Sequence, residues 1–562
     1  RRLRNGNERL MLKVRKIFLI LAFLSCVPVA YSQIIPSAAD LAPADNAGAD
    51  LNRTVRDLQK STIERDLSRE RKFSQKKEEK VDGSAAAKAD IPETRVMLKK
   101  VEFSESKVLS NEQLREFAAK YEDRVVGIAE LNELVGKINL WYRANGYITA
   151  MAALPPQELK DGKLRIVLIE GTMGQVKIEG NTNTRNSYIR NRVKIPEGEL
   201  LDIRSLDRSL AWFNGTNDVK LRIKLQAGAE PGTTDCYILA YEPADNVGSL
   251  FVDTAGNRST GQTRSGFSYT DYSVSGRRDV FNMTALAAKN SKSAIMSYNT
   301  PINRRGTRLS LYNSFNSLVI IQDDANGFSI KGRSSSLGLS LTHPLKITTN
   351  YREELVLDVH RQNAENKVLG MTFVDDEEKR YSLGKSFLKL LSGEALYFKP
   401  TWSYCEYEGL SGRKHVQKFA LDGLWQKVRT TGQQINLRVA GQKAADDFMP
   451  SSDQFLLGGL YSVRGYNESV IGGDSGLNLK VDYLFPIKAL ESAQLFTFYD
   501  WGRIYGKSLL VTKMIHSFGF GFRHSFANDS QITFTVGFPL EKEIGDQRAD
   551  SHKFDLSLNF LF

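Results

Sequence analysis

The stretch from Gly458 to Leu477 contains two residue groups that could do chemistry. Gly473-Asp474-Ser475-Gly476 has the pattern that surrounds the nucleophilic serine in one class of hydrolases. Val463-Arg464-Gly465-Tyr466 places a guanidinium group among glycine-rich segments. Such a group donates a fork of hydrogen bonds to a carboxylate. The stretch therefore indicates either a hydrolase or an arginine with a structural task.

The rest of the chain does not support a hydrolase. A nucleophilic serine needs a histidine base and a carboxylate that orients the base. The six histidines lack the sequence context of that class, and no disulfide framework accompanies them; they are His343, His360, His415, His516, His524 and His552. The chain also contains no phosphate-binding loop, no His-Glu-x-x-His and no Gly-x-Ser-x-Gly. Asp474-Ser475 between glycines is more simply a turn, so we expect no catalytic residue, no metal and no cofactor.

A carboxylate that could pair with Arg464 follows in Phe498-Tyr499-Asp500-Trp501-Gly502. This segment resembles a strand, in which Phe498 and Asp500 fall on the same face. If that face borders a polar lumen, the Arg464–Asp500 pair would hold the loop 455–476 inside it. The alternative is an exposed arginine in a surface loop, and the spacing alone leaves both interpretations open.

Residues 246–562 alternate between apolar and polar side chains and show little helical period. In the last segment one face carries only apolar side chains, at Phe554, Leu556, Leu558, Phe560 and Phe562. A period of two with apolar residues outside and polar residues inside is typical of a membrane β-barrel, although a soluble β-sandwich also alternates. The number of strands, the terminal Phe562 and an export signal favour the barrel. At roughly 20 residues per strand and loop, the region predicts about 16 antiparallel strands.

The export signal lies in residues 1–32, which we assign to an N-terminal extension and a signal peptide. Met11 is the expected start, basic residues and an apolar run follow, and Ala30-Tyr31-Ser32 is a cleavage pattern; a buried helix or short anchor is the alternative. Cleavage would leave Cys236 and Cys405, whose spacing indicates neither a disulfide framework nor a metal site. This cysteine usage fits a bacterial envelope protein. The net charge is +12, but no basic helix with interleaved aromatics occurs, so we expect no nucleic-acid partner.

Three further segments precede the predicted barrel. Residues 33–95 contain a charged, mostly polar helix at 51–80 and a linker. Because this helix has little apolar surface, it must be solvated or lie in a polar environment. Residues 96–171 and 172–245 each read as a β-α-α-β-β unit and together predict an internal repeat; two unrelated α+β modules are the alternative. In the first unit, Gly146 is the expected left-handed stop of the main helix.

The motif Val463–Tyr466, followed by Phe498, Asp500 and Gly502 as Phe-x-Asp-x-Gly, resembles the BamA-like superfamily of outer-membrane barrels. Within it, nearly the whole mature chain is similar to the two-partner secretion transporters (TpsB; ShlB/FhaC/HecB type), with a polar helix, a linker, two POTRA domains and a barrel. Further matching positions in the first POTRA domain are Asn145, Gly146, Tyr147, Pro155, Pro156, Gly162 and Gly171. One departure is Tyr466, where relatives carry phenylalanine, and either aromatic residue fits.

The resemblance implies a 16-stranded outer-membrane translocator that exports a large β-helical exoprotein of haemolysin or adhesin type without ATP. It implies that the POTRA domains, in the periplasm, bind this TpsA-like partner by strand addition. It also implies that the polar helix plugs the lumen and that Arg464 and Asp500 anchor the loop. Further expected partners are outer-membrane lipid, lipopolysaccharide and the barrel-assembly machinery. The alternatives are a BamA-like insertion factor, which usually has more POTRA repeats, a plain porin and a secreted hydrolase.

Overall fold

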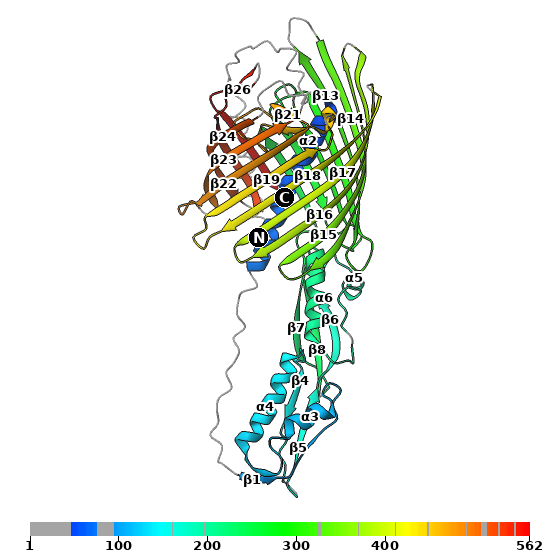
Figure 1. Cartoon of the computed structure of the whole chain (residues 1–562), viewed down its shortest axis with the longest axis vertical. Helices are drawn as coiled ribbons and strands as arrows, with labels where there is room; N and C mark the ends of the chain where they lie inside the picture. Colours follow the sequence, from blue (N-terminus) through cyan, green and yellow to red (C-terminus); the bar gives the residue numbers. More distant parts are fainter. Residues whose placement is uncertain are drawn as a thin grey trace, which may run out of the picture.

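The computed structural model describes residues 46–75, 95–159, 161–195, 197–230, 232–322, 328–368, 370–410, 412–446, 449–490, 492–506, 514–526, 529–544 and 547–562. Along the chain follow helix α2 (Ala47–Gln75), two small α+β units and a closed β-barrel (Figure 1). The expected signal peptide and the linker before residue 95 lie outside the described residues. No helix in the described ranges has both the length and the apolar character that crossing a membrane requires.

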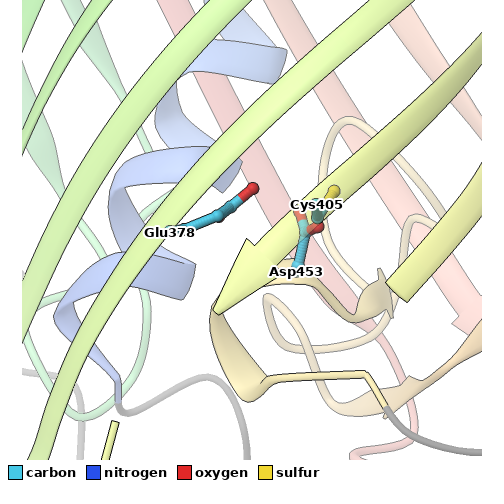
Figure 2. A group of neighbouring side chains, drawn as sticks. All are labelled: Glu378, Cys405 and Asp453. Atoms are coloured by element: carbon cyan, nitrogen blue, oxygen red, sulfur yellow. The ribbon is translucent and has the colours of Figure 1, made fainter. Parts of the chain in front are cut away.

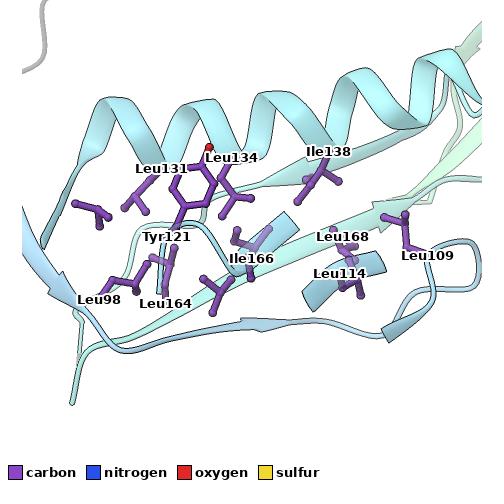
Figure 3. Packing of buried hydrophobic residues seen from close by; sticks show 14 of the residues in the cluster. Leu98, Leu109, Leu114, Tyr121, Leu131, Leu134, Ile138, Leu164, Ile166 and Leu168 are labelled. Atoms are coloured by element: carbon purple, nitrogen blue, oxygen red, sulfur yellow. The ribbon is translucent and has the colours of Figure 1, made fainter. Parts of the chain in front are cut away.

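The first α+β unit packs two helices on a small sheet. Its elements are β1 (Arg95–Leu98), β2 (Lys100–Phe103), α3 (Asn111–Ala118), β3 (Arg124–Gly127), α4 (Ile128–Ala144), β4 (Ala150–Ala153) and β5 (Lys163–Glu170). The sheet has the order β2-β5-β4, with β2 and β5 parallel and β4 antiparallel to β5. Leu134 and Ile138 of α4 pack against Leu164 and Ile166 of β5, and all four are buried (Figure 3).

The second unit follows the same plan. Its elements are β6 (Thr172–Glu179), α5 (Asn186–Arg190), α6 (Ile203–Thr216), β7 (Lys220–Ala227) and β8 (Thr233–Tyr241). The sheet order is β6-β8-β7, with β6 parallel and β7 antiparallel to β8. In both units the last strand is the central strand and is parallel to the strand before the helices. The two units therefore share one topology, as the predicted repeat requires.

Sixteen antiparallel strands form the closed barrel, as predicted from the length of the region. They are β9 (Asn246–Asp253), β10 (Arg264–Asp271), β11 (Val280–Ala287), β12 (Ser291–Pro301), β13 (Arg308–Gln322), β14 (Phe328–Ile347), β15 (Tyr351–Val368), β16 (Met371–Leu391), β17 (Glu394–Gly409), β18 (Gly412–Val428), β19 (Gln434–Ala444), β22 (Ser475–Pro486), β23 (Ala493–Tyr505), β24 (Met514–Phe526), β25 (Ser530–Pro539) and β28 (Lys553–Leu561). The ring closes where β28 pairs with β9.

The barrel wall has an apolar outer face and a polar inner face. On β14, Ser336 is 5% exposed, whereas the neighbouring Leu337 is 53% exposed. On β28, Asp555 is 1% exposed and Phe554 is 55% exposed. Because the exposed apolar residues lie outside a closed ring, the alternation is that of a lipid-facing barrel rather than a soluble sandwich.

Helix α2 lies inside the barrel (Figure 1). It contacts β13, β14, β15 and the short 3-10 helix η4 (Ser451–Asp453). A polar helix in a polar lumen agrees with the requirement stated from its composition. The helix begins at Ala47, earlier than the predicted start at residue 51, because the Asn46 side chain accepts a hydrogen bond of 2.7 Å from the Gly48 N–H and caps the first turn. It also makes apolar contacts with the wall that the sequence did not indicate, through Ala47 near its start and Leu67 further along.

The first strand of this unit is interrupted. The segment 95–103 forms β1 and β2, which pair with different partners. The break lies at Lys99, because the N–H groups of Lys99 and Lys100 both donate to the Gly162 carbonyl, at 2.7 and 3.2 Å.

Candidate functional site: the inward loop and the lumen helix

The segment 455–476, here called the inward loop, turns back into the barrel. Its ends pair as β20 (Phe455–Leu457) and β21 (Ile471–Gly473). Between them Val463 is 0% and Tyr466 1% exposed. Gly465 has a φ of +89°, a left-handed conformation that glycine adopts without strain. The loop is therefore a packed part of the lumen and not a surface excursion.

Arg464 and Asp500 are in direct contact. The Arg464 Nε and Nη2 atoms donate to Asp500 Oδ2 and Oδ1, each at 2.7 Å, and the Arg464 backbone N–H donates to Oδ2 at 3.0 Å. Nη2 also donates to Asp482 Oδ1 on β22 at 2.6 Å. Asp500 is fully buried and Arg464 is 6% exposed. Of the two alternatives left open by the sequence, the structure has the internal arginine.

The Phe498 ring packs against the guanidinium group of Arg464. The Arg464 Cζ atom lies 3.7 Å from the centroid of the Phe498 ring, a cation–π arrangement. The ring in turn lies over Gly519 of β24, where a Cβ atom would collide with it. Gly502, two residues after Asp500, leaves room for the inward loop in the same way, since a Cβ atom there would lie 2.7 Å from Leu457 Cδ1. The Phe-x-Asp-x-Gly motif thus forms one continuous surface on which the loop packs.

Tyr466 attaches the loop to β24 and to the segment after β25. Its hydroxyl oxygen lies 2.8 Å from the His516 carbonyl oxygen and accepts a hydrogen bond of 3.0 Å from the Glu541 N–H. Its own carbonyl accepts from Lys553 Nζ at 3.2 Å. Val463-Arg464-Gly465-Tyr466 therefore touches β22, β23, β24, β25 and β28 and the segment after β25.

The inward loop and the stretch just before it also hold helix α2. Asn52 Nδ2 donates to the Ser452 carbonyl at 2.8 Å, and Lys60 Nζ donates to the Tyr461 carbonyl at 3.3 Å. Arg53 Nη1 lies 3.7 Å from Glu468 Oε2, and both side chains are almost fully buried. These contacts link the helix to the segment that carries Arg464.

The remaining contacts of the helix end are with the barrel wall. Asn316 Nδ2 donates to Asp50 Oδ2 at 3.1 Å, and Gln362 Nε2 donates to the Gly48 carbonyl at 3.3 Å. Position 48 leaves little room for a side chain. A Cβ atom on Gly48 would lie 3.0 Å from both Gln362 Nε2 of the wall and Ser452 Cβ of η4. These contacts of the helix are hydrogen bonds and an ion pair, so water could replace them if the helix left the lumen.

A buried charged cluster fixes η4 to the wall. Figure 2 shows Glu378 of β16, Cys405 of β17 and Asp453 of η4, whose potential ligand atoms all lie within 4.8 Å of one another. A metal is nevertheless disfavoured there, because Arg380 donates to both carboxylates and Lys418 donates to Asp453. Two cations already balance two carboxylates, and a third cation would add repulsion in a buried site.

The matching residues of the first POTRA-like unit are mostly structural, and two form its joint with the second unit. Asn145 and Gly146 end α4, and Gly146 has the expected left-handed φ, +92°. The Gly146 carbonyl accepts from the Ile203 N–H at 3.0 Å, and the Asn145 carbonyl accepts from Arg204.

The other matching residues lie nearby. Tyr147 packs on the core of the unit. Pro155 and Pro156 lie in the connection between β4 and β5, Gly162 directly precedes β5, and Gly171 joins the two units. At the far end of the chain, Phe562 exchanges two backbone hydrogen bonds with Gly248, at 2.9 and 3.0 Å, beside the seam of the barrel.

Ser475 does not have the surroundings of a nucleophile in the described part of the chain. Its Oγ accepts a hydrogen bond of 3.0 Å from the Ala444 N–H, and the residue begins β22. Gly473–Gly476 thus enters a strand of the barrel wall.

Sequence reasoning missed several contributors to the site. Asp482 could have been found from strand alternation, because with Asn478 and Lys480 it forms the polar face of the strand that follows the loop. Glu468, Asp453 and Gly537 carry no local pattern that marks them. Their roles depend on barrel closure, which the sequence does not display.

Comparisons with known proteins agree with this architecture. The family model described as "POTRA domain, ShlB-type" matches residues 96–171. The model described as "Haemolysin secretion/activation protein ShlB/FhaC/HecB" matches residues 242–524, just over half of the chain.

Similar proteins include the heme/hemopexin transporter protein HuxB of Haemophilus influenzae, 24% identical over 80% of this chain and 83% of that protein. The outer membrane transporter CdiB of Dickeya dadantii is 23% identical over 67% of this chain and 70% of that protein. Among solved structures, CdiB from Escherichia coli has a TM-score of 0.67 at 17% identity and covers 94% of this chain and all of that one. BamA from Haemophilus ducreyi, lacking POTRA domains 1–3, has a TM-score of 0.51 at 12% identity and covers 83% of this chain and all of that one.

Proposed function

The chain belongs to the haemolysin secretion/activation family of the ShlB/FhaC/HecB type, the two-partner secretion transporters of the bacterial outer membrane, and we propose that it exports one dedicated exoprotein. The barrel lies in the outer membrane and the POTRA-like units lie in the periplasm. The exported chain is a large β-helical protein of haemolysin or adhesin type, carried without ATP. HuxB is named for heme and hemopexin, which makes a haem-acquisition exoprotein one candidate cargo.

The observation that carries the proposal is helix α2 inside the lumen. A helix that fills a barrel blocks passage, yet this one is held by hydrogen bonds and ion pairs that water can replace. Its apolar contacts with the wall are few and lie in two small clusters, around Ala47 and around Leu67. We therefore assign α2 as a removable plug that leaves when the exoprotein enters.

Members of this family act with a secreted partner through their POTRA domains, and two sheet edges here suit that contact. In the described residues β4 and β7 each pair on one side only, with β5 and β8. An extended segment of the exoprotein can add to such an edge through backbone hydrogen bonds. Met151 of β4, 49% exposed, offers an apolar contact beside that edge.

The remaining partners follow from the place of the barrel. Lipid and lipopolysaccharide would cover its apolar outer face, on which Leu337 and Phe554 are exposed. The barrel-assembly machinery would insert the chain, with Phe562 as the terminal aromatic residue of its signal.

The test compares cells with and without this protein by mass spectrometry of the culture medium and of the outer membrane. We expect one large exported protein to vanish from the medium while other barrels keep their amounts. Depletion of many outer-membrane barrels would instead assign the chain to assembly, the function suggested by its fold similarity to BamA. Re-expression of the chain should restore the single exported protein.

A further inference from the structure

A pocket of about 260 Å³ lies where the second POTRA-like unit meets the rim of the barrel. It is formed by α5 and the residues beside it, by the turn 272–279 between β10 and β11 and by the turn 302–307 between β12 and β13. Four arginines line it: Arg185, Arg192, Arg277 and Arg304. Such a density of guanidinium groups in one small pocket suits an anionic ligand.

The charge of these arginines is not balanced locally. Ion pairs found among the described residues include none of the four, whereas the adjacent Arg278 pairs with Asp218 and Asp245. Burial lowers the pKa of Arg192, and the positive charges of Arg308, Arg277 and Arg304 lower it further. The pocket therefore concentrates positive charge that an anion would neutralise.

One of the four side chains, that of Arg192, is already held in place, and the backbone of Arg185 is fixed beside it. Arg192 stacks on Tyr188, with its Cζ 3.7 Å from the ring centroid, and its Nη2 donates to the Asn303 carbonyl at 2.8 Å. The Arg185 N–H donates to the Gly276 carbonyl at 3.0 Å, and a Cβ atom on Gly276 would lie 2.8 Å from Arg185 Cγ. Little side-chain entropy of Arg192 would be lost when a ligand binds to it.

Apolar side chains beside the pocket indicate the source of the anion. Ile302, which lines the pocket, and Val274 on the other turn are each 52% exposed. Tyr298, at the end of β12 next to them, is 37% exposed. These turns lie at the periplasmic end of the lipid-facing strands, where a phosphate group and an acyl chain are found together.

We propose that this pocket binds the phosphate group of an anionic phospholipid in the periplasmic leaflet. The headgroup lies among the four arginines, and the acyl chains lie along Ile302 and the outer wall. Because Arg185 and Arg192 belong to the POTRA-like unit and Arg277 and Arg304 to the barrel, the bound lipid bridges the two and fixes their relative orientation.

The test measures lipid binding to the full-length chain refolded in uncharged detergent, by native mass spectrometry. The probes are short-chain phosphatidylglycerol, phosphatidylcholine with the same chains, and inorganic phosphate. We expect one phosphatidylglycerol to bind at least about tenfold more tightly than phosphatidylcholine, and high salt to weaken it. Equal affinity for the two lipids would overturn the proposal. Displacement of phosphatidylglycerol by an equal concentration of inorganic phosphate would assign the pocket to free phosphate and would also overturn it.

The variants Arg277→Ala/Arg304→Ala and Arg277→Glu/Arg304→Glu change only exposed turn residues, so the barrel should still assemble. We expect the alanine pair to weaken phosphatidylglycerol binding about tenfold and the glutamate pair to abolish it. The matched control is Arg143→Ala/Arg165→Ala, which removes two exposed arginines from the first POTRA-like unit and should leave binding unchanged. Equal losses in the control and the alanine pair would mean non-specific attraction and would refute the site.

Discussion

The backbone of Gly465 in the inward loop lies directly against the backbone of Gly537 in β25. A Cβ atom on Gly537 would lie 2.6 Å from the Gly465 nitrogen and 2.7 Å from its Cα. A Cβ atom on Gly465 would lie 3.0 Å from the Gly537 carbonyl carbon. Backbone atoms cannot rotate away as a side chain can, so the loop docks only while both positions lack a side chain.

We therefore expect Gly537→Ala to displace the inward loop without opening the barrel. Overpacking of this kind costs about 1–3 kcal/mol, which lowers the ratio of docked to undocked loop by roughly five- to 150-fold. Secretion should fall, while the protein still shows the heat-dependent gel migration of a closed barrel.

The matched control is Gly423→Ala in β18, where the nearest atom to a new Cβ would be 3.7 Å away. This variant should secrete normally. Equal secretion by the two variants would show that the Gly465–Gly537 contact does not matter for transport.

Arg464→Ala should abolish secretion while the barrel still assembles. The change leaves the carboxylate of fully buried Asp500 without its fork of donors, and breaking a buried pair from one side costs about 3–5 kcal/mol. The loop can relieve this cost by detaching from the wall, which should expose residues 458–470 to added protease. Secretion and protease cleavage are measured in the same cells.

A surface ion pair provides the control for Arg464. Arg413 Nη2 lies 2.9 Å from Glu408 Oε2, but the two side chains are 67% and 60% exposed. Such pairs contribute roughly 0–1 kcal/mol to stability, so Arg413→Ala should change neither secretion nor protease cleavage. If Arg464→Ala secretes as well as Arg413→Ala, the loop is not anchored for transport by this arginine.

A disulfide between α2 and η4 should stop transport reversibly. The Cβ atom of a residue at position 48 would lie 3.0 Å from Ser452 Cβ, slightly closer than the roughly 3.5–4.5 Å of a disulfide. A small shift would let Gly48→Cys/Ser452→Cys cross-link. If α2 is a plug that must leave, secretion stops under oxidising conditions and resumes after reductant.

The two single-cysteine variants separate this effect from the cost of the substitutions themselves. Cys236 and Cys405, the native cysteines in the described residues, are both buried and free, and burial raises the pKa of the Cys236 thiol to about 11, which keeps it unreactive. Normal secretion by the cross-linked protein would mean that transport does not require the helix to move.

Parts of this site follow from sequence and others do not. Strand alternation placed Phe498 and Asp500 on one face, and that local rule holds in the structure. The length of the region gave the strand number because strand and loop lengths vary little in such barrels. Gly537 and Asp453 could not be assigned, since each acts on a segment brought to it only by closure of the ring. Gly146 was predicted as a helix stop, but its contact with the second unit depends on how two separate units dock.

The stability of the second POTRA-like unit should depend on pH through Glu242. Its carboxylate accepts hydrogen bonds from the N–H groups of Thr182, Asn183 and Thr184, at 3.1, 2.9 and 2.9 Å. Burial alone would raise the pKa of Glu242, but the hydrogen bonds from these three residues outweigh it and lower the pKa. A carboxyl group with a lowered pKa adds stability above its unfolded pKa of about 4.3 and loses it as the pH falls through the folded pKa.

Urea unfolding of residues 95–245 between neutral pH and about pH 3 tests this expectation. Wild type should exceed Glu242→Gln by up to about 1 kcal/mol above pH 5, a small difference because the group is partly solvated. The difference should shrink at lower pH, where both side chains are neutral. The control Glu179→Gln, at an exposed position at the end of β6, should follow wild type throughout. A difference between wild type and Glu242→Gln that stays constant with pH would show that the ionised carboxylate is not what joins β8 to the segment before α5.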